Sequence, residues 1–329
     1  MRTAEAVSFG HPDKICDQIS DAILDECLIR DEDARVAIET MGGHEKIYIC
    51  GEISMNNMMN KSDISAIARK VYRSCGYEDE VKIQVNVVSQ SPDISQGVDN
   101  GGAGDQGIMI GYACNDNEAM IPQELYLARK ILQEVIDLGY GPDGKSQVTL
   151  DDDGKISRLV ISVQHKEGEE TETVKHVAET YCDDYIVNGT GKFVIGGFQG
   201  DTGLTGRKIV QDAYGPQVSV GGGAFSGKDP SKVDRSAAYM ARKIAVDLLK
   251  DLSIYDEVLV KIAYSIGVAE PVMAVAEVGT LKAERIDLLK GCKYDLTPKG
   301  IIDFLDLKKP IYQKTAKNGH FGNGFNWDK

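Results

Sequence analysis

The chain has 329 residues, of which 42% are hydrophobic, so it can bury a large core and has the length of two or three domains. Its formal net charge of -14 disfavours a nucleic-acid partner, because proteins of that class depend on basic surfaces. Its seven cysteines form no Cys-x-x-Cys pair, and no apolar run reaches the ~20 residues of a membrane span, so we expect a cytoplasmic protein without disulfides, a zinc site or a membrane partner.

A helix is predicted close to the amino terminus. Apolar residues recur at helical spacing from Ile15 to Cys27, and Pro12 suits the first turn. His11 and Asp13 therefore lie at a helix amino terminus. A histidine in this position is either a cap or surface residue or a functional group, and the pattern does not decide between the two.

Two alternating segments joined by a glycine pair predict a hairpin over residues 35–54. The hairpin carries Glu39 and Glu52, which are either exposed strand carboxylates or members of a site. A helix over residues 61–75 and a strand over residues 81–90 follow.

Turn and loop residues fill most of the next segment, residues 91–107. We interpret it as a mobile active-site loop, with a domain linker as the alternative. Its Gly102-x-Gly104-x-x-Gly107 spacing matches the dinucleotide fingerprint. We reject that fingerprint because Asp105 would face the pyrophosphate, and because residues 108–112 resemble a strand where a helix is required.

The order of helix, hairpin and helix occurs three times, over residues 12–76, 122–182 and 230–290. We therefore expect an α+β protein of three structurally related α/β units in a pseudo-threefold arrangement, each sheet covered on one face by helices. The expected boundaries are 1–90 for the amino-terminal unit, 91–107 for the loop, 108–195 for an abbreviated central unit and 196–329 for the carboxy-terminal unit with the phosphate-binding loops.

The most informative stretch is a glycine-rich, basic segment over residues 221–236. Its glycines can bring bare N–H groups against a ligand, and Asp229 followed by Pro230 predicts that a helix begins there. Because a helix amino terminus attracts phosphate, Lys228 and Lys232 could clamp one polyanion from two sides. A plain loop-to-helix joint is the alternative.

Two features refine this interpretation. Asp234 could either pair with the lysines or hold Mg²⁺ against the same phosphates. The spacing of Gly222, Gly227 and Lys228 resembles a P-loop, but Asp229 stands where that motif needs Ser or Thr. A P-loop kinase is therefore the weaker hypothesis.

Four segments, in this order, closely resemble the S-adenosylmethionine synthetase (methionine adenosyltransferase) family. They are residues 10–14, 101–107, 203–208 and the glycine-rich stretch. The resemblance extends from about Glu5 to Trp327. It implies a transferase in which the methionine sulfur attacks C5′ of ATP and the released triphosphate is hydrolysed to diphosphate and phosphate.

The resemblance also implies the roles of individual residues. A thioether sulfur needs no general base, whereas the charge that grows on the leaving triphosphate must be met by fixed cations and Mg²⁺. The implied catalytic residues are His11, Lys145, Arg207, Lys208, Lys228 and Lys232. ATP would contact His11, Asp143, Lys145, Lys192, Phe193, Asp201, Arg207, Lys208, Ala224 and Lys228, and methionine would contact Glu52, Gln96, Asp105, Asp201 and Lys232. Asp13 and Asp234 would hold two Mg²⁺ ions, and Glu39 would hold K⁺.

The same resemblance implies a homodimer, or a tetramer built from it, whose sheets pack at the dimer interface and whose subunits share each active site. Three departures from the family stand out. The loop between Gln96 and Asp105 is shorter than in common bacterial members, Lys192 stands where the family often has arginine, and the central unit is abbreviated around residues 179–189. A catalytically weak nucleotide-binding relative is therefore the alternative.

Overall fold

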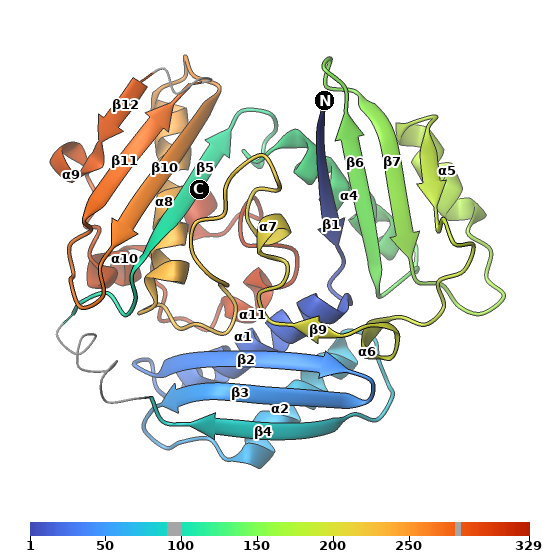
Figure 1. Cartoon of the computed structure of the whole chain (residues 1–329), viewed down its shortest axis with the longest axis horizontal. Helices are drawn as coiled ribbons and strands as arrows, with labels where there is room; N and C mark the ends of the chain where they lie inside the picture. The colour runs from blue at the N-terminus through green and yellow to red at the C-terminus, as the bar shows by residue number, and fades with distance from the viewer. Residues whose placement is uncertain (91–100, 280–283) are drawn as a thin grey trace.

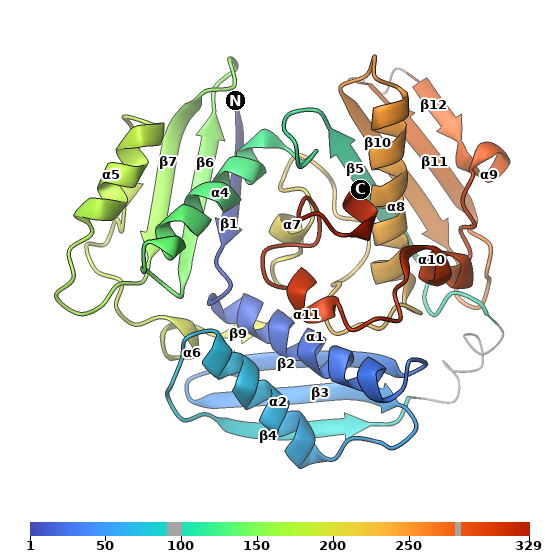
Figure 2. The same ribbon diagram turned by 180° about the vertical axis from the view of Figure 1, so that it is seen from behind.

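The computed structural model describes residues 1–90, 101–279 and 284–329, and these residues form three four-stranded sheets, each covered on one face by helices (Figure 1). Figure 1 views the sheets from the side away from most of the helices, whereas Figure 2, turned by 180°, has the helices in front. The predicted α+β class with three units is confirmed. Gln96 lies outside the described residues. Within them, no helix is long and apolar enough to cross a membrane.

The first sheet has the strand order β4-β3-β2-β9, and the predicted hairpin forms its centre. The turn lies at His44 and Glu45, whose φ angles are 47° and 69°, rather than at the preceding glycines. The elements of this sheet and its helices are α1 (Pro12–Arg30), β2 (Arg35–Gly43), β3 (Lys46–Ser54), α2 (Lys61–Ser74), β4 (Lys82–Val88) and β9 (Gly203–Leu204).

The second sheet has the order β1-β6-β7-β8 and is covered by α4 and α5. Its elements are β1 (Arg2–Val7), α4 (Gln123–Asp137), β6 (Gly144–Leu150), β7 (Ile156–Val163), α5 (Glu172–Tyr181) and β8 (Tyr185–Val187). The short helices α6 (Gly197–Gly200) and α7 (Ile209–Asp212) follow in the chain.

The third sheet has the order β12-β11-β10-β5 and packs against α8. Its elements and the tail that follows are β5 (Gly107–Cys114), α8 (Val233–Asp251), β10 (Glu257–Tyr264), β11 (Met273–Val278), β12 (Glu284–Asp287), α9 (Leu288–Gly291), α10 (Pro298–Leu305), α11 (Tyr312–Thr315) and the 3₁₀ turn η1 (Asn326–Asp328). The third repeat thus ends in a strand and a four-residue helix rather than in a full helix.

The sheets do not follow the contiguous boundaries expected from the sequence. β1 pairs with β6 of the central unit, β5 pairs with β10 of the carboxy-terminal unit, and β9 pairs with β2 of the amino-terminal unit. Strands that follow one another in sequence are neighbours in space often but not always. Each unit is therefore tied to another by a shared strand.

Close approach of β5 to α8 depends on Gly111. A Cβ atom added there would lie 2.0 Å from the backbone carbon of Ala241, and a helix backbone cannot move aside as a side chain can. We expect Gly111→Ala to lower the free energy of unfolding by roughly 1–3 kcal/mol, measured by urea denaturation. Gly291→Ala is the control, because an added Cβ meets nothing within 4 Å there. Equal midpoints for the two variants would contradict this packing.

Candidate functional site

Five of the residues expected at the site line one open cavity of about 280 Å³. They are His11, Asp143, Lys145, Phe193 and Asp201. They come from the start of α1, from the turn that leads into β6 and the start of that strand, and from the chain on either side of α6. The fold thus gathers three segments that are far apart in sequence.

His11 is the N-cap of α1, and its Nδ1 accepts a hydrogen bond from the N–H of Asp13 at 3.2 Å. Burial, together with the nearby charge of Lys208, lowers the pKa of its imidazole to about 3. The ring is therefore neutral, and its proton is on Nε2. A capping histidine can still donate a hydrogen bond from Nε2, so the two interpretations left open by the sequence are compatible.

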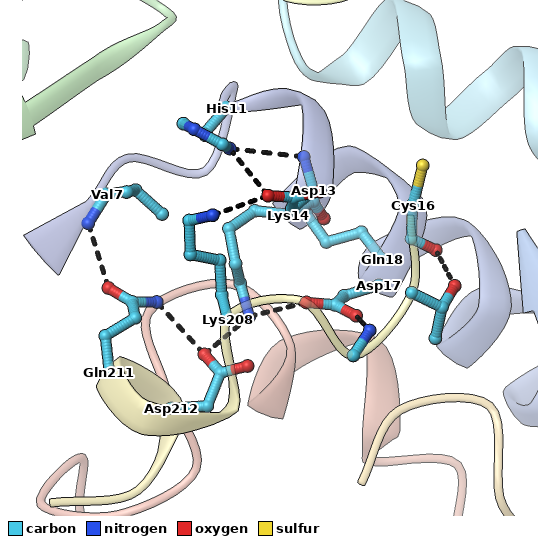
Figure 3. A network of polar contacts seen from close by, with 12 residues as sticks. Val7, His11, Asp13, Lys14, Cys16, Asp17, Gln18, Lys208, Gln211 and Asp212 are labelled. Carbon is cyan, nitrogen blue, oxygen red and sulfur yellow. Dashed lines mark hydrogen bonds and ion pairs between the residues drawn. The ribbon is translucent and has the colours of Figure 1, made fainter. Parts of the chain in front are cut away.

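Asp13 lies between His11 and Lys208 of the loop 203–208 (Figure 3). Its Oδ2 accepts a hydrogen bond from Lys208 at 2.5 Å, and its Oδ1 lies 3.6 Å from Nε of Arg207. Oδ1 also accepts the backbone N–H of Leu204 at 2.9 Å. Burial opposes ionisation, but the bonds from Lys208 and Leu204 hold the pKa of Asp13 below its ordinary value.

Both lysines of the glycine-rich stretch are paired with carboxylates. Lys228 Nζ lies 2.6 Å from Oδ2 of Asp234, and Lys232 Nζ lies 2.5 Å from Oδ2 of Asp229. The predicted start of the helix was wrong, because α8 begins at Val233. Asp229 does not cap it, because its carboxylate accepts hydrogen bonds from the N–H groups of Val36 and Ser231 as well as from Lys232.

The two basic loops lie side by side along the edge of β2. Gly203 and Leu204 pair with Gly42 and Met41, while the N–H of Ile38 donates to the carbonyl of Gly227 at 2.9 Å. The loops also touch directly, since a Cβ atom added to Gly206 would lie 2.4 Å from Cβ of Ala224. The cations of both loops therefore belong to one region of the molecule.

Other expected residues lie apart from this region. Glu39 and Glu52 are on β2 and β3, in the register of the sheet face that points away from α1. Asp105 is exposed just before β5, and Lys192 is exposed and pairs with Glu167 at 2.9 Å. Gln96 lies outside the described residues.

Sequence reasoning missed several buried groups that anchor the basic loops. Asp17, Asp21 and Arg235 are each at most 1% exposed, and all three bond to these loops or to residues beside them. A signal was present, because aspartate recurs at every fourth residue from Asp13 to Asp25. It was overlooked because the apolar residues alone were enough to predict the helix.

The described residues contain no group of three or more His, Cys, Asp or Glu side chains that could hold a metal ion. Asp13 and Asp234 each offer a single carboxylate beside a lysine of the basic loops. Mg²⁺ commonly binds through one or two carboxylates together with substrate phosphates and water. The two aspartates therefore fit an ion that arrives with a phosphate chain.

Comparison with known proteins decides the family. Models of the amino-terminal, central and carboxy-terminal domains of S-adenosylmethionine synthetase match residues 1–97, 100–193 and 195–329. The chain belongs to the S-adenosylmethionine synthetase family. The S-adenosylmethionine synthases of Helicobacter hepaticus and Mycoplasma capricolum are 45% and 42% identical to it, over 99% of this chain and 95% and 94% of their own lengths.

A solved structure agrees with this assignment. It is described as an unusual S-adenosylmethionine synthetase from Campylobacter jejuni, and it matches with a TM-score of 0.89 and 30% identity over 100% of this chain and 96% of that one. The sequence alignment with the Helicobacter hepaticus protein spans 369 residues, which exceeds the length of this chain. That relative therefore carries insertions that this member of the family lacks.

A pH dependence follows from Asp143 beside the cavity. Burial raises the pKa of its carboxyl from 3.8 to about 6, although the N–H of Gly197 and the charge of Lys145 oppose the rise. The protonated group therefore contributes stability that is fully present below about pH 4 and is lost as pH rises through 6. We expect Asp143→Asn to gain up to about 3 kcal/mol relative to the wild type between pH 4 and 7, measured by urea unfolding. A difference that stays constant with pH would contradict a raised pKa.

Proposed function

We propose that this chain joins ATP and L-methionine to form S-adenosylmethionine, with release of diphosphate and phosphate. The observation that carries the proposal is that Arg207, Lys208 and Lys228 lie on two touching loops, the first of which reaches Asp13 next to His11 of the cavity. The sulfur lone pair would form the bond to C5′, and the C5′–oxygen bond would break with its electrons on the triphosphate. Water would then hydrolyse the triphosphate to diphosphate and phosphate.

The residues around the leaving group have the charge that this reaction needs. A thioether is a nucleophile without losing a proton, so the protein has to position the substrates and stabilise the departing anion. Lys208 and Lys228 would exchange their carboxylate partners for phosphate oxygens. His11, neutral and protonated at Nε2, would donate a hydrogen bond near the oxygen that leaves C5′, and Lys145 would extend the positive lining of the cavity.

The remaining predicted contacts fall around this centre. Asp143, Phe193, Asp201 and Ala224 would contact the nucleotide, with Lys192 at the margin, and Lys232 would serve both ATP and methionine. Asp13 and Asp234 would hold two Mg²⁺ ions, which would supply additional neutralisation of the phosphate oxygens when bound. Glu39 would hold K⁺ on the exposed side of β2.

A homodimer is part of the proposal, with a tetramer as a further level of pairing. Figure 1 views the sheet faces opposite the helices. Among the described residues, exposed Met41, Tyr48 and Ile108 alternate with buried residues of β2, β3 and β5, which puts them on these faces. A second copy packed against them would cover these side chains. It would also bring a second set of Glu52, Gln96 and Asp105 toward the basic loops, which explains why one chain leaves Glu52 and Asp105 outside the cavity.

Product analysis tests the function. The purified protein is incubated with ATP, methionine, Mg²⁺ and K⁺, and the products are identified by mass. We expect the sulfonium product together with diphosphate and phosphate. Bound ATP without a sulfonium would support the weak nucleotide-binding relative instead, and a phosphorylated acceptor with C5′ untouched would support a kinase.

The lysines of the glycine-rich stretch provide a mutational test. We expect Lys228→Ala and Lys232→Ala each to lower turnover by at least about a hundredfold, because each removes a cation that faces the growing charge. Lys250→Ala is the control, since this lysine is exposed at the other end of α8. Circular dichroism would verify that all three variants are folded. Normal turnover in both site variants would remove the lysines from the mechanism.

A further inference from the structure

Helix α1 carries an aspartate at every fourth position, and we call Asp13, Asp17, Asp21 and Asp25 the aspartate row. Residues four apart lie one above the other on a helix, so the row follows one face of α1. Each member accepts hydrogen bonds from backbone N–H groups in the second half of the chain. The row is thus a line of attachment for segments that follow residue 200.

Asp17 attaches the loop 203–208, which we call the first basic loop. Its Oδ1 accepts the N–H of Gly206 at 2.8 Å, and its Oδ2 accepts a hydrogen bond from Lys14 at 3.0 Å. Lys14 also donates to Asp212 at 2.6 Å, so the buried cation is shared by two carboxylates (Figure 3). Gly206 immediately precedes Arg207 and Lys208, so Asp17 fixes the backbone from which these two side chains extend.

Asp21, together with Arg235, attaches the glycine-rich stretch, which we call the second basic loop. The guanidinium of Arg235 donates to both carboxylate oxygens, at 2.6 and 2.8 Å, and Asp21 Oδ1 also accepts the N–H of Gly227 at 2.8 Å. Arg235 then donates to the carbonyl of Lys228 at 3.1 Å. One fully buried ion pair therefore bonds the backbone on both sides of the Lys228 side chain, at the N–H of Gly227 and the carbonyl of Lys228.

Carboxylates suit this task for a physical reason. Gly206 and Gly227 have φ angles of 82° and 83°. Glycine adopts this backbone conformation readily, but it adopts others as readily, so glycine alone does not fix the loop. A hydrogen bond to an ionised acceptor is stronger than a neutral one, although burying the charge is costly without a partner. Lys14 and Arg235 provide those partners, although burial still raises the pKa of Asp17 to about 7. Both carboxyl groups attach the backbone where the loop itself is permissive.

We propose that Asp17 and Asp21 are positioning residues for the transferase reaction, which set the places of Arg207, Lys208 and Lys228 by holding the backbone of their loops. The inference rests on the proposed function for its effect on turnover. The attachments themselves do not depend on it. Both aspartates are buried beneath the loops, so they would act on the reaction through the loop backbone.

Asp25 provides a matched control within the same row. Its two oxygens accept the N–H groups of Tyr312 and Gln313, each at 2.9 Å, so it attaches α11 and carries no part of the basic loops. In Asp17, Asp21 and Asp25 alike, both oxygens accept hydrogen bonds. An asparagine has one acceptor oxygen, so the substitution leaves one donor unsatisfied in each case. At Asp17 and Asp21 it also removes the charge that pairs with buried Lys14 or Arg235, whereas Asp25 has no such ion pair among the described residues.

The experiment compares Asp17→Asn, Asp21→Asn and Asp25→Asn with the wild type. We expect kcat to fall by about 10²-fold in the first two, because small displacements of catalytic groups have effects of that size. We also expect weaker binding of Mg²⁺-tripolyphosphate by calorimetry, with the KM for methionine little changed. Asp25→Asn should keep the wild-type kcat and tripolyphosphate affinity. A fall in kcat without weaker tripolyphosphate binding in Asp17→Asn and Asp21→Asn would indicate only a loss of folded protein and would overturn the proposal.

Hydrogen exchange provides a readout that does not need activity. The amide of Gly206 should exchange faster in Asp17→Asn, and that of Gly227 in Asp21→Asn, whereas Asp25→Asn should leave both unchanged. Kinetic and exchange values equal to those of Asp25→Asn would overturn the proposal. A wild-type protein that makes no sulfonium would contradict the proposed function, while amide exchange would still test the attachments.

Ser20→Ala covers the case in which the aspartate variants do not fold. Ser20 lies on α1, and its Oγ is 2.9 Å from Oγ1 of Thr205 in the first basic loop, so its removal leaves no unpaired charge. We expect a reduced kcat and weaker tripolyphosphate binding in the folded variant. Wild-type values for both would overturn the role of α1 in positioning this loop.

Discussion

Pairing of cations with carboxylates is the interaction on which the site depends. Lys208, Lys228 and Lys232 each lie within 2.6 Å of an aspartate oxygen, in surroundings where the lysine side chains are at most 24% exposed. Unpaired cations at such largely buried positions would lose hydration without compensation. The carboxylates keep them in place without substrate, and a phosphate chain with its metal ions can take over the same charges.

The fold provides this pairing by bringing distant segments onto two elements. The edge of β2 receives both basic loops as additional backbone partners, and α1 holds the same loops from its aspartate row. The exchange of β1, β5 and β9 between sheets ties the three units that contribute to the cavity and the loops. Architecture and charge therefore support each other, because each loop is fixed both by strand pairing and by buried carboxylates.

The sequence predicted what local patterns encode. Helical spacing identified α1 and α2, and alternation identified the hairpin of β2 and β3, because periodicity reports which face is buried. The partners of β1, β5 and β9 could not be read in this way, since pairing across more than a hundred residues leaves no local signal. Asp229 was wrongly expected to cap α8 because its carboxylate has a tertiary partner, Val36, that the local sequence does not reveal.

The sequence likewise predicted only part of the candidate site. Motifs named the cations of the basic loops, whereas the aspartates and Arg235 beneath them were missed because buried charge resembles ordinary helix sequence. Glu52 and Asp105 lie away from the cavity, and in the proposed homodimer a second copy would supply them.

The most direct test of the account is a crystal structure of the protein with Mg²⁺, methionine and a non-hydrolysable ATP analogue. The account predicts phosphate oxygens within hydrogen-bond distance of Lys208 and Lys228 Nζ, with Gly206 and Gly227 still bonded to α1. Phosphates bound away from both glycine-containing loops would contradict it.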